Sequence, residues 1–262
     1  MSEVKPDQVE ALFHGFTHPR RKPLSDAEQG LLDQAEAHDI VHEGLHLSAW
    51  LWGKQHPVER RVLLMHGWES RAAHWGGFVP ALLAADFQVC AFDGPAHGDS
   101  DGQQADVISF GRAAASVAQY FGPLHATIGH SAGSPATLYA FSQGIKVNAS
   151  VHISGPSSLV RMLGNLERGM LPAELRQAFR QRFEAYLGQP ASAMDIESLQ
   201  HGLRHRALIV HDREDAEVPY SEAVALQQAW PQAELVSVEG LGHRRILKDP
   251  DVIARTIAFL AN

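Results

Sequence analysis

Gly129-His130-Ser131-Ala132-Gly133-Ser134 is the stretch from which the rest of this 262-residue chain is best interpreted. A short apolar run, 126–128, precedes it, and a helix-like segment, 132–143, follows it. Strand, Gly-x-Ser-x-Gly and helix in that order predict a very sharp turn with Ser131 at its apex. The residues two before and two after the apex must be small so that the strand and the helix can close up. Gly129 and Gly133 meet that requirement.

Such a turn presents two chemically useful groups. It exposes the Ser131 hydroxyl, and it leaves the backbone N–H of Ala132 at a helix N-terminus, where negative charge is stabilised. The five-residue pattern is weak by itself, because glycine and serine are common in ordinary turns. The remainder of the chain must therefore decide between an ordinary turn and a catalytic one.

Strand and helix patterns alternate along most of the chain. Apolar strands are predicted at 61–65, 87–92, 147–153, 207–210 and 234–238, and helices at 77–85, 106–121, 221–230 and 250–260. Apolar strands separated by helices predict a parallel sheet covered on both faces. Residues 44–53 alternate apolar and polar side chains, which predicts a half-buried strand, and Ile40-Val41 offers it an antiparallel edge partner.

Two segments depart from this alternation. Residues 157–203 carry no strand signal, and Leu175, Phe179 and Phe183 recur there at helical spacing, which predicts an amphipathic helical insertion. Residues 3–38 are predicted to be helical with a break, and a capping box begins at Ser25. We interpret the basic turn 19–23 before it as a solvated connection.

Composition excludes several classes of protein. The net charge is −8, and without a long basic run nucleic acid is not an expected partner. A single cysteine, Cys90, excludes an intramolecular disulfide and is expected to be buried. No apolar signal segment or window of about 18 apolar residues occurs, so we expect a cytoplasmic protein without a membrane span. The 16 histidines are scattered, and we expect no metal and no cofactor, since phosphate-binding glycine motifs are absent as well.

Four motifs occur in one order: His66-Gly67-Trp68, the loop 93–100, the 129–133 turn, and late acid and histidine segments. In this order they resemble the α/β-hydrolase family over nearly the whole chain. The resemblance implies an α/β fold with a mostly parallel eight-stranded sheet flanked by helices. It also implies a single domain, 1–262, with a core at 39–156 and 204–262, a small helical cap at 157–203 and an N-terminal helical segment at 1–38.

The resemblance also implies a catalytic triad. A serine hydroxyl needs a base within reach, and the base needs an acceptor that fixes its tautomer. In the family's order these groups match Ser131, Asp215 and His243. We assign Asp215 because the Val218-Pro219 pair that follows it anchors the register. The family's usual glycine three positions earlier is Asp212 here, so Asp212 and Glu214 are the alternative acids.

The oxyanion hole implied by the family uses the backbone N–H groups of Trp68 and Ala132. His66, His97 and His130 match positions that are usually structural and hold the loops by hydrogen bonds. The loop 93–100 carries Ala96 where glycine is usual, which affects the local geometry. An aspartate nucleophile, as in dehalogenase relatives, is excluded by Ser131.

The function implied is hydrolysis of a small-molecule carboxylic ester by an acyl-enzyme route. We expect the apolar cap residues to line an acyl or alcohol pocket: Met162, Leu163, Met170, Leu171 and Phe179. A thioesterase or an aminopeptidase of the same fold is the alternative enzyme, and a ligand receptor without turnover is the alternative from another class. The sequence does not determine the natural substrate, the acyl length, the pathway, the oligomeric state or the role of residues 1–38.

Overall fold

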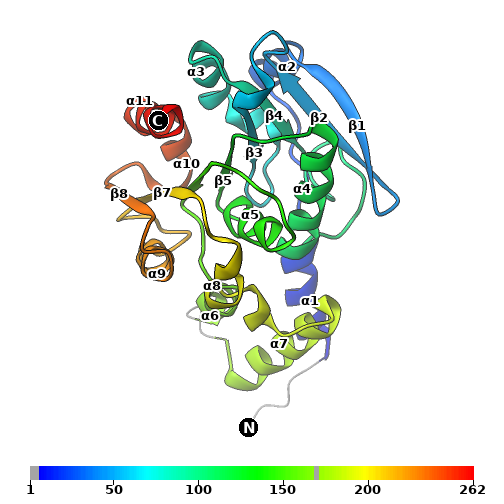
Figure 1. Ribbon diagram of the computed structural model, residues 1–262. Coiled ribbons are helices and arrows are strands. Elements are labelled where there is room, and N and C mark those ends of the chain that lie inside the picture. The colour runs from blue at the N-terminus through cyan, green and yellow to red at the C-terminus, as the bar shows by residue number, and fades with distance from the viewer. Residues whose placement is uncertain (1–5, 168–170) are drawn as a thin grey trace.

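The computed structural model describes residues 6–167 and 171–262. Within them, an eight-stranded sheet has the order β1-β2-β4-β3-β5-β6-β7-β8 (Figure 1). β1 and β2 pair antiparallel, as do β2 and β4, and the other neighbours are parallel, so the predicted mostly parallel sheet is confirmed. The strands are β1 (Glu36–His42), β2 (Leu45–Trp52), β3 (Arg61–Met65), β4 (Gln88–Phe92), β5 (Ala126–His130), β6 (Ala149–Ile153), β7 (Arg206–Asp212) and β8 (Glu234–Val238).

Helices cover both faces of the sheet, as the apolar strands require. On one face a hydrophobic cluster joins the sheet to α2 (Asp26–Leu32), α3 (Phe78–Ala84) and α11 (Pro250–Ala261). On the other face a second cluster joins it to α4 (Val107–Phe121), α5 (Gly133–Ser142) and α9 (Ser221–Ala229) (Figure 1). Strands β3, β4, β5 and β6 are buried along their full length, and Cys90 lies among them with no exposed surface.

Local signals in the sequence set several helix ends. The side chain of Ser25 accepts the backbone N–H of Glu28, and the Glu28 carboxylate accepts that of Ser25, which confirms the predicted capping box. Asp106 caps α4 through the N–H groups of Ile108 and Ser109. Each of these side chains satisfies backbone donors that a helix leaves without an internal partner.

Two predictions about the first 53 residues were wrong. The helical segment was expected to run to residue 38, but β1 already begins at Glu36 and pairs with β2 over its whole length. Residues 44–53 were expected to bury one face, yet Trp50 and Trp52 on the polar side are buried as well. Helix α2 covers them, and the Trp52 indole N–H donates to the Leu31 carbonyl at 2.9 Å. An alternating pattern of apolar and polar residues predicts a strand with one face in water. Here α2, from another part of the sequence, packs on that face and excludes the water.

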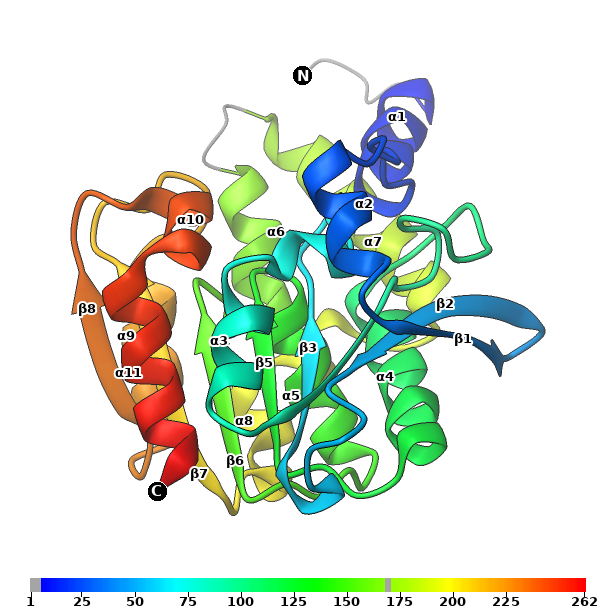
Figure 2. The same cartoon turned by 90° about the horizontal axis from the view of Figure 1, so that it is seen from above.

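The segment between β6 and β7 carries helices and no strand where it is described, as expected, and contains α6 (Leu159–Glu167), α7 (Ala173–Leu187) and α8 (Ile196–Leu199). Helix α1 (Pro6–Thr17) packs against α7, with the Phe16 ring edge-on to Phe179 and Phe183. The N-terminal segment therefore joins these helices above the carboxyl ends of the strands (Figure 2). Among the described residues, no helix is long and apolar enough to cross a membrane.

Several histidines are buried in this fold, and acid is expected to unfold it. Burial is the main cause that lowers the pKa of His97 to about 4 and those of His130 and His152 to about 3. Between those values and 6.5 the unfolded chain binds protons that the folded chain does not, so stability falls as the pH decreases. Each such histidine contributes about 1.4 kcal/mol per pH unit. Burial also raises the pKa of Asp93 to about 6, and this single group opposes the trend, whereas burial lowers the pKa of His66 and His205 as well.

Urea unfolding at pH 7.5, 6.0 and 5.0 would measure this effect. The midpoint should decrease at each step with an unchanged m-value. A midpoint that stays constant or increases from pH 7.5 to 5.0 would contradict the prediction.

Candidate active site

Ser131 lies on the turn between β5 and α5, in left-handed backbone with a φ of +52°. Few residues other than glycine adopt this conformation, which the surrounding packing must hold in place. A Cβ atom on Gly129 would lie 2.7 Å from the Gly133 carbonyl oxygen, and one on Gly133 would collide with the Met65 carbonyl oxygen. The strand and the helix therefore approach as closely as the sequence predicted, and the serine projects from the apex.

The predicted base and acid are in contact. His243 lies on the short helix α10 (Gly242–Arg245), and its Nδ1 donates to Asp215 Oδ2 at 2.8 Å. The other carboxylate oxygen accepts the N–H groups of Glu217 and Val218, both at 2.9 Å. Burial raises the pKa of Asp215, but His243 and these two donors outweigh it, so the pKa lies below its ordinary value. The carboxylate stays ionised, fixes the proton on Nδ1 and leaves Nε2 as the nitrogen that can accept a proton.

The other two candidate carboxylates have different surroundings. Glu214 is exposed. Asp212 is fully buried and accepts the backbone N–H groups of Leu241 and Gly242 with Oδ2, and that of Glu214 with Oδ1. Burial raises the pKa of Asp212, and the three donors more than offset it, so the pKa is lowered. This aspartate ties the end of β7 to the two residues that precede His243.

Replacing Asp212 with alanine is expected to reduce both stability and activity. Three partly buried backbone N–H groups lose their acceptor, which costs about 2 kcal/mol or more. The loop before His243 then loosens, and kcat is expected to fall about 10- to 100-fold. Thermal unfolding and initial rates with p-nitrophenyl acetate would measure these losses. Glu214→Gln, two residues away and exposed, is the matched control, and equal behaviour of the two variants would contradict the role of Asp212.

The predicted oxyanion groups lie beside the serine. A Cβ atom on Gly67 would be 3.0 Å from Ser131 Cβ, so the loop after β3 packs directly on the turn. His66 donates from Nδ1 to the Gly67 carbonyl at 2.7 Å and accepts the Gly94 N–H at Nε2. Within the described part of the chain, the N–H groups of Trp68 and Ala132 have no acceptor. Both remain available to a charge that develops near Ser131.

Two further histidines hold loops, as expected. His130 Nε2 donates to the His243 carbonyl at 2.8 Å, and His97 Nδ1 to the Pro95 carbonyl at 2.9 Å. The low pKa of each keeps the ring neutral. In the loop 93–100, Ala96 adopts a φ of +62°, so the alanine that replaces the family's glycine occupies left-handed backbone.

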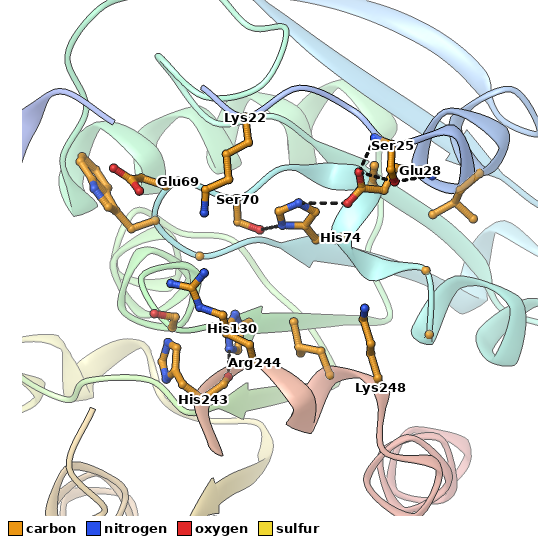
Figure 3. A pocket seen from close by; sticks show the side chains of 18 of the residues that line it. Lys22, Ser25, Glu28, Glu69, Ser70, His74, His130, His243, Arg244 and Lys248 are labelled. Atoms are coloured by element: carbon orange, nitrogen blue, oxygen red, sulfur yellow. Dashed lines mark hydrogen bonds and ion pairs between the residues drawn. The ribbon is translucent and has the colours of Figure 1, made fainter. Parts of the chain in front are cut away.

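Ser131 and His243 line one cavity of about 720 Å³ (Figure 3). Its walls come from the segment around α2, the loop after β3, and α10 with the residues that follow it. The lining residues are Lys22, Ser25, Ala27, Glu28, Leu31, Gly67, Trp68, Glu69, Ser70, Ala73, His74, Gly76, Gly77, His130, Ser131, Glu217, His243, Arg244, Leu247 and Lys248.

The expected apolar lining from residues 157–203 does not occur in this cavity. No described residue of that segment contributes to the wall. Leu163 on α6 and Phe179 on α7 are buried in the hydrophobic core instead, Phe179 where α7 packs against α1. Met170 lies outside the described residues. The basic turn 19–23, interpreted above as a solvated connection, supplies Lys22 to the wall. The three consecutive basic residues Arg20, Arg21 and Lys22 were the feature of the sequence from which this role could have been predicted.

No group of three or more histidine, cysteine or acidic side chains that could hold a metal ion occurs in residues 6–167 and 171–262. Two pairs of histidines lie four residues apart, His42 with His46 and His201 with His205, and each side chain has another partner. His42 bonds to Ser116, His46 to Asp39, His201 to the Ser198 carbonyl, and His205 to Ser150.

Comparisons with known proteins agree with this architecture. Residues 62–256 match the model of the alpha/beta hydrolase family. No curated protein matches the chain in sequence. Among solved structures, an esterase of Pyrococcus furiosus superposes with a TM-score of 0.73 at 20% identity, over 94% of this chain and 97% of the other.

Two further solved structures are similar to the chain. An esterase from Rhodococcus has a TM-score of 0.66 at 18% identity, with 87% of this chain and 99% of the other covered. A ferulic-acid-bound protein from Butyrivibrio proteoclasticus has a TM-score of 0.66 at 19% identity, with 86% and 96% covered. At these sequence identities the solved structures show that the fold is shared and nothing more. The family model, by contrast, matches most of the chain in sequence. The chain belongs to the alpha/beta hydrolase family.

Proposed function

We propose that this protein is a serine hydrolase that cleaves carboxylic esters through an acyl-enzyme intermediate. Ser131 is the nucleophile, His243 the base and then the acid, and Asp215 the group that orients His243. The backbone N–H groups of Trp68 and Ala132 form the oxyanion hole. The single observation that carries the proposal is the shared cavity, which is lined both by a serine on a left-handed turn and by a histidine paired with a buried carboxylate.

In the first half of the reaction the Ser131 oxygen attacks the ester carbonyl carbon, and its proton passes to His243 Nε2. The carbonyl oxygen becomes an oxyanion that accepts the two N–H groups. The carbon–oxygen bond to the alcohol then breaks, and the proton on Nε2 is delivered to the leaving oxygen. The alcohol departs and the acyl group remains on Ser131.

In the second half a water molecule takes the place of the alcohol. His243 removes its proton, the hydroxide attacks the acyl carbon, and the bond to Ser131 breaks. The proton on Nε2 returns to the serine oxygen, and the carboxylic acid is released. No cofactor is needed for this sequence, because every proton moves between the substrate, water, Ser131 and His243.

Labelling with a fluorophosphonate probe tests the nucleophile directly. The probe reacts only with a serine whose hydroxyl is activated, and mass spectrometry of the digested protein identifies the modified peptide. We expect one modification, on Ser131, and none after heat denaturation. A folded protein that remains unlabelled would overturn the proposed activity and favour a ligand receptor without turnover.

A thioesterase or an aminopeptidase would use the same triad, so the cavity has to discriminate between them. An aminopeptidase needs a free carboxylate for the substrate's ammonium group. The wall carboxylates Glu28, Glu69 and Glu217 are already paired with neighbouring side chains, which favours the ester over the peptide. Rates with p-nitrophenyl esters, acyl thioesters and aminoacyl amides would separate the three. The cytoplasmic location stays a prediction.

A further inference from the structure

Two ammonium groups, those of Lys22 and Lys248, border the cavity that Ser131 lines. Lys22 extends into it from the segment before α2, and Lys248 extends toward it from the opposite side (Figure 3). In the part of the chain that the structure describes, neither side chain makes a hydrogen bond or an ion pair. His74 lies on the wall between them. Burial is the main cause that lowers its pKa, the charge of Glu28 opposes this, and the charges of Lys22, Arg71 and Lys248 lower the pKa further. Both lysines are therefore close to the same part of the cavity.

The negative charges on the wall are already paired. Each carboxylate that lines the cavity has another donor at hydrogen-bond distance, and among the described residues none of them forms an ion pair with Lys22 or Lys248, although the charge of Lys22 helps to lower the pKa of Glu69. The pairs are Glu69 with Arg20 at 2.8 Å, Glu217 with Arg244 at 3.0 Å, and Glu28 with the Ser25 N–H and hydroxyl at 2.8 Å and His74 at 3.2 Å.

Lys22 and Lys248 give one part of the wall a local positive charge, although the lining as a whole is balanced, with the basic residues Lys22, Arg244 and Lys248 against Glu28, Glu69 and Glu217. The whole chain carries a net charge of −8, yet these two ammonium groups on the cavity wall form no ion pair among the described residues. A neutral ester would leave both ammonium groups unused, and an α-ammonium group would be repelled. A negative group placed between them would gain two favourable charge interactions.

We propose that this cavity binds a carboxylate of the substrate between Lys22 and Lys248, so that the preferred substrates are esters that carry a second, negatively charged group. This inference rests on the proposed ester hydrolysis and adds the substrate class to it. Both lysines are exposed, so each contributes a modest amount, and together they favour the anionic ester by about tenfold.

Two p-nitrophenyl esters of equal size test the preference. In mono-p-nitrophenyl glutarate the acyl chain ends in a carboxylate, and in p-nitrophenyl 5-methylhexanoate an isopropyl group replaces it. After subtraction of the rate that each ester shows in buffer without enzyme, where the glutarate carboxylate also attacks its own ester carbonyl, we expect kcat/KM to be about tenfold higher for the glutarate ester at low salt. The ratio should decrease at 0.5 M salt, because exposed charges are screened there.

The variants assign the preference to the two lysines. Lys22→Gln/Lys248→Gln is expected to reduce the ratio of the two kcat/KM values to about one. Lys54→Gln is the matched control, because Lys54 is also exposed but pairs with Glu36 and does not line the cavity. A second substrate pair, 3-(4-acetoxyphenyl)propionate and its amide, carries the charge on the alcohol part instead. The pair with the larger ratio identifies the part of the ester that lies between the lysines.

Binding of glutarate to the Ser131→Ala variant, measured by calorimetry, tests the site without turnover. We expect saturable binding that Lys22→Gln/Lys248→Gln weakens at least tenfold. If esters are hydrolysed with a ratio near one and glutarate does not bind, the anionic substrate class is wrong and the hydrolase stands. If no ester is hydrolysed but glutarate binds through the lysines, the proposed activity is wrong and the anion site stands.

Discussion

Replacing Ser131 with alanine is expected to reduce kcat for ester hydrolysis by about 10⁶-fold, the largest effect that we predict for a single substitution. The variant loses the atom that forms the acyl bond, and neither His243 nor the oxyanion N–H groups can replace it. Some rate above that in water should remain, because the cavity still binds the ester and the two N–H groups still face its carbonyl. Steady-state rates with p-nitrophenyl esters at high enzyme concentration would measure the residual activity.

The same variant should remain folded. Ser131 occupies left-handed backbone, and alanine adopts that conformation no more readily than serine, so the turn keeps its shape. Thermal unfolding within about 2 °C of the parent protein, together with loss of fluorophosphonate labelling, would separate lost chemistry from lost structure. Turnover at the parent rate in a folded Ser131→Ala protein would exclude the acyl-enzyme route and the assignment of the nucleophile.

Asp215→Asn is expected to reduce kcat by about 10⁴-fold with little change in KM. The asparagine amide donates to His243 Nδ1 and thus forces the ring proton onto Nε2, so the nitrogen that faces the substrate can no longer accept a proton. The positive charge that forms on the ring also loses its carboxylate partner. Pre-steady-state rates of acylation would measure the loss at the step where His243 acts as the base.

A structural role alone would not give this result. The carbonyl oxygen of the asparagine can still accept the N–H groups of Glu217 and Val218, so the loop should stay in place and unfolding should change little. By contrast, Asp212→Ala should affect stability as well as rate, because its three donors lose their only acceptor among the described residues. An Asp215→Asn variant that is destabilised as much as Asp212→Ala, with a similar loss of rate, would contradict the distinction.

Short-range patterns predicted the sheet and the turn that carries the serine. Apolar runs at 61–65 and 87–92 became strands β3 and β4 because side chains buried on both faces leave a continuous apolar signal. The left-handed turn at Ser131 follows from the close approach that Gly129 and Gly133 permit. The expected triad residues also came from the sequence, since motif order in a known family places the acid and the histidine after particular strands.

Only the tertiary structure decided what surrounds the candidate site. Lys22, His74 and Lys248 meet at one cavity although they are far apart in the chain, and no periodic pattern connects them. Trp52 is buried because α2 covers it, and Asp212 gains its role because residues 241 and 242 fold against it. The spacing of hydrophobic residues predicts which face of a helix or strand is buried. The partner that a face or a charge meets depends on how distant segments pack, which a local pattern does not contain.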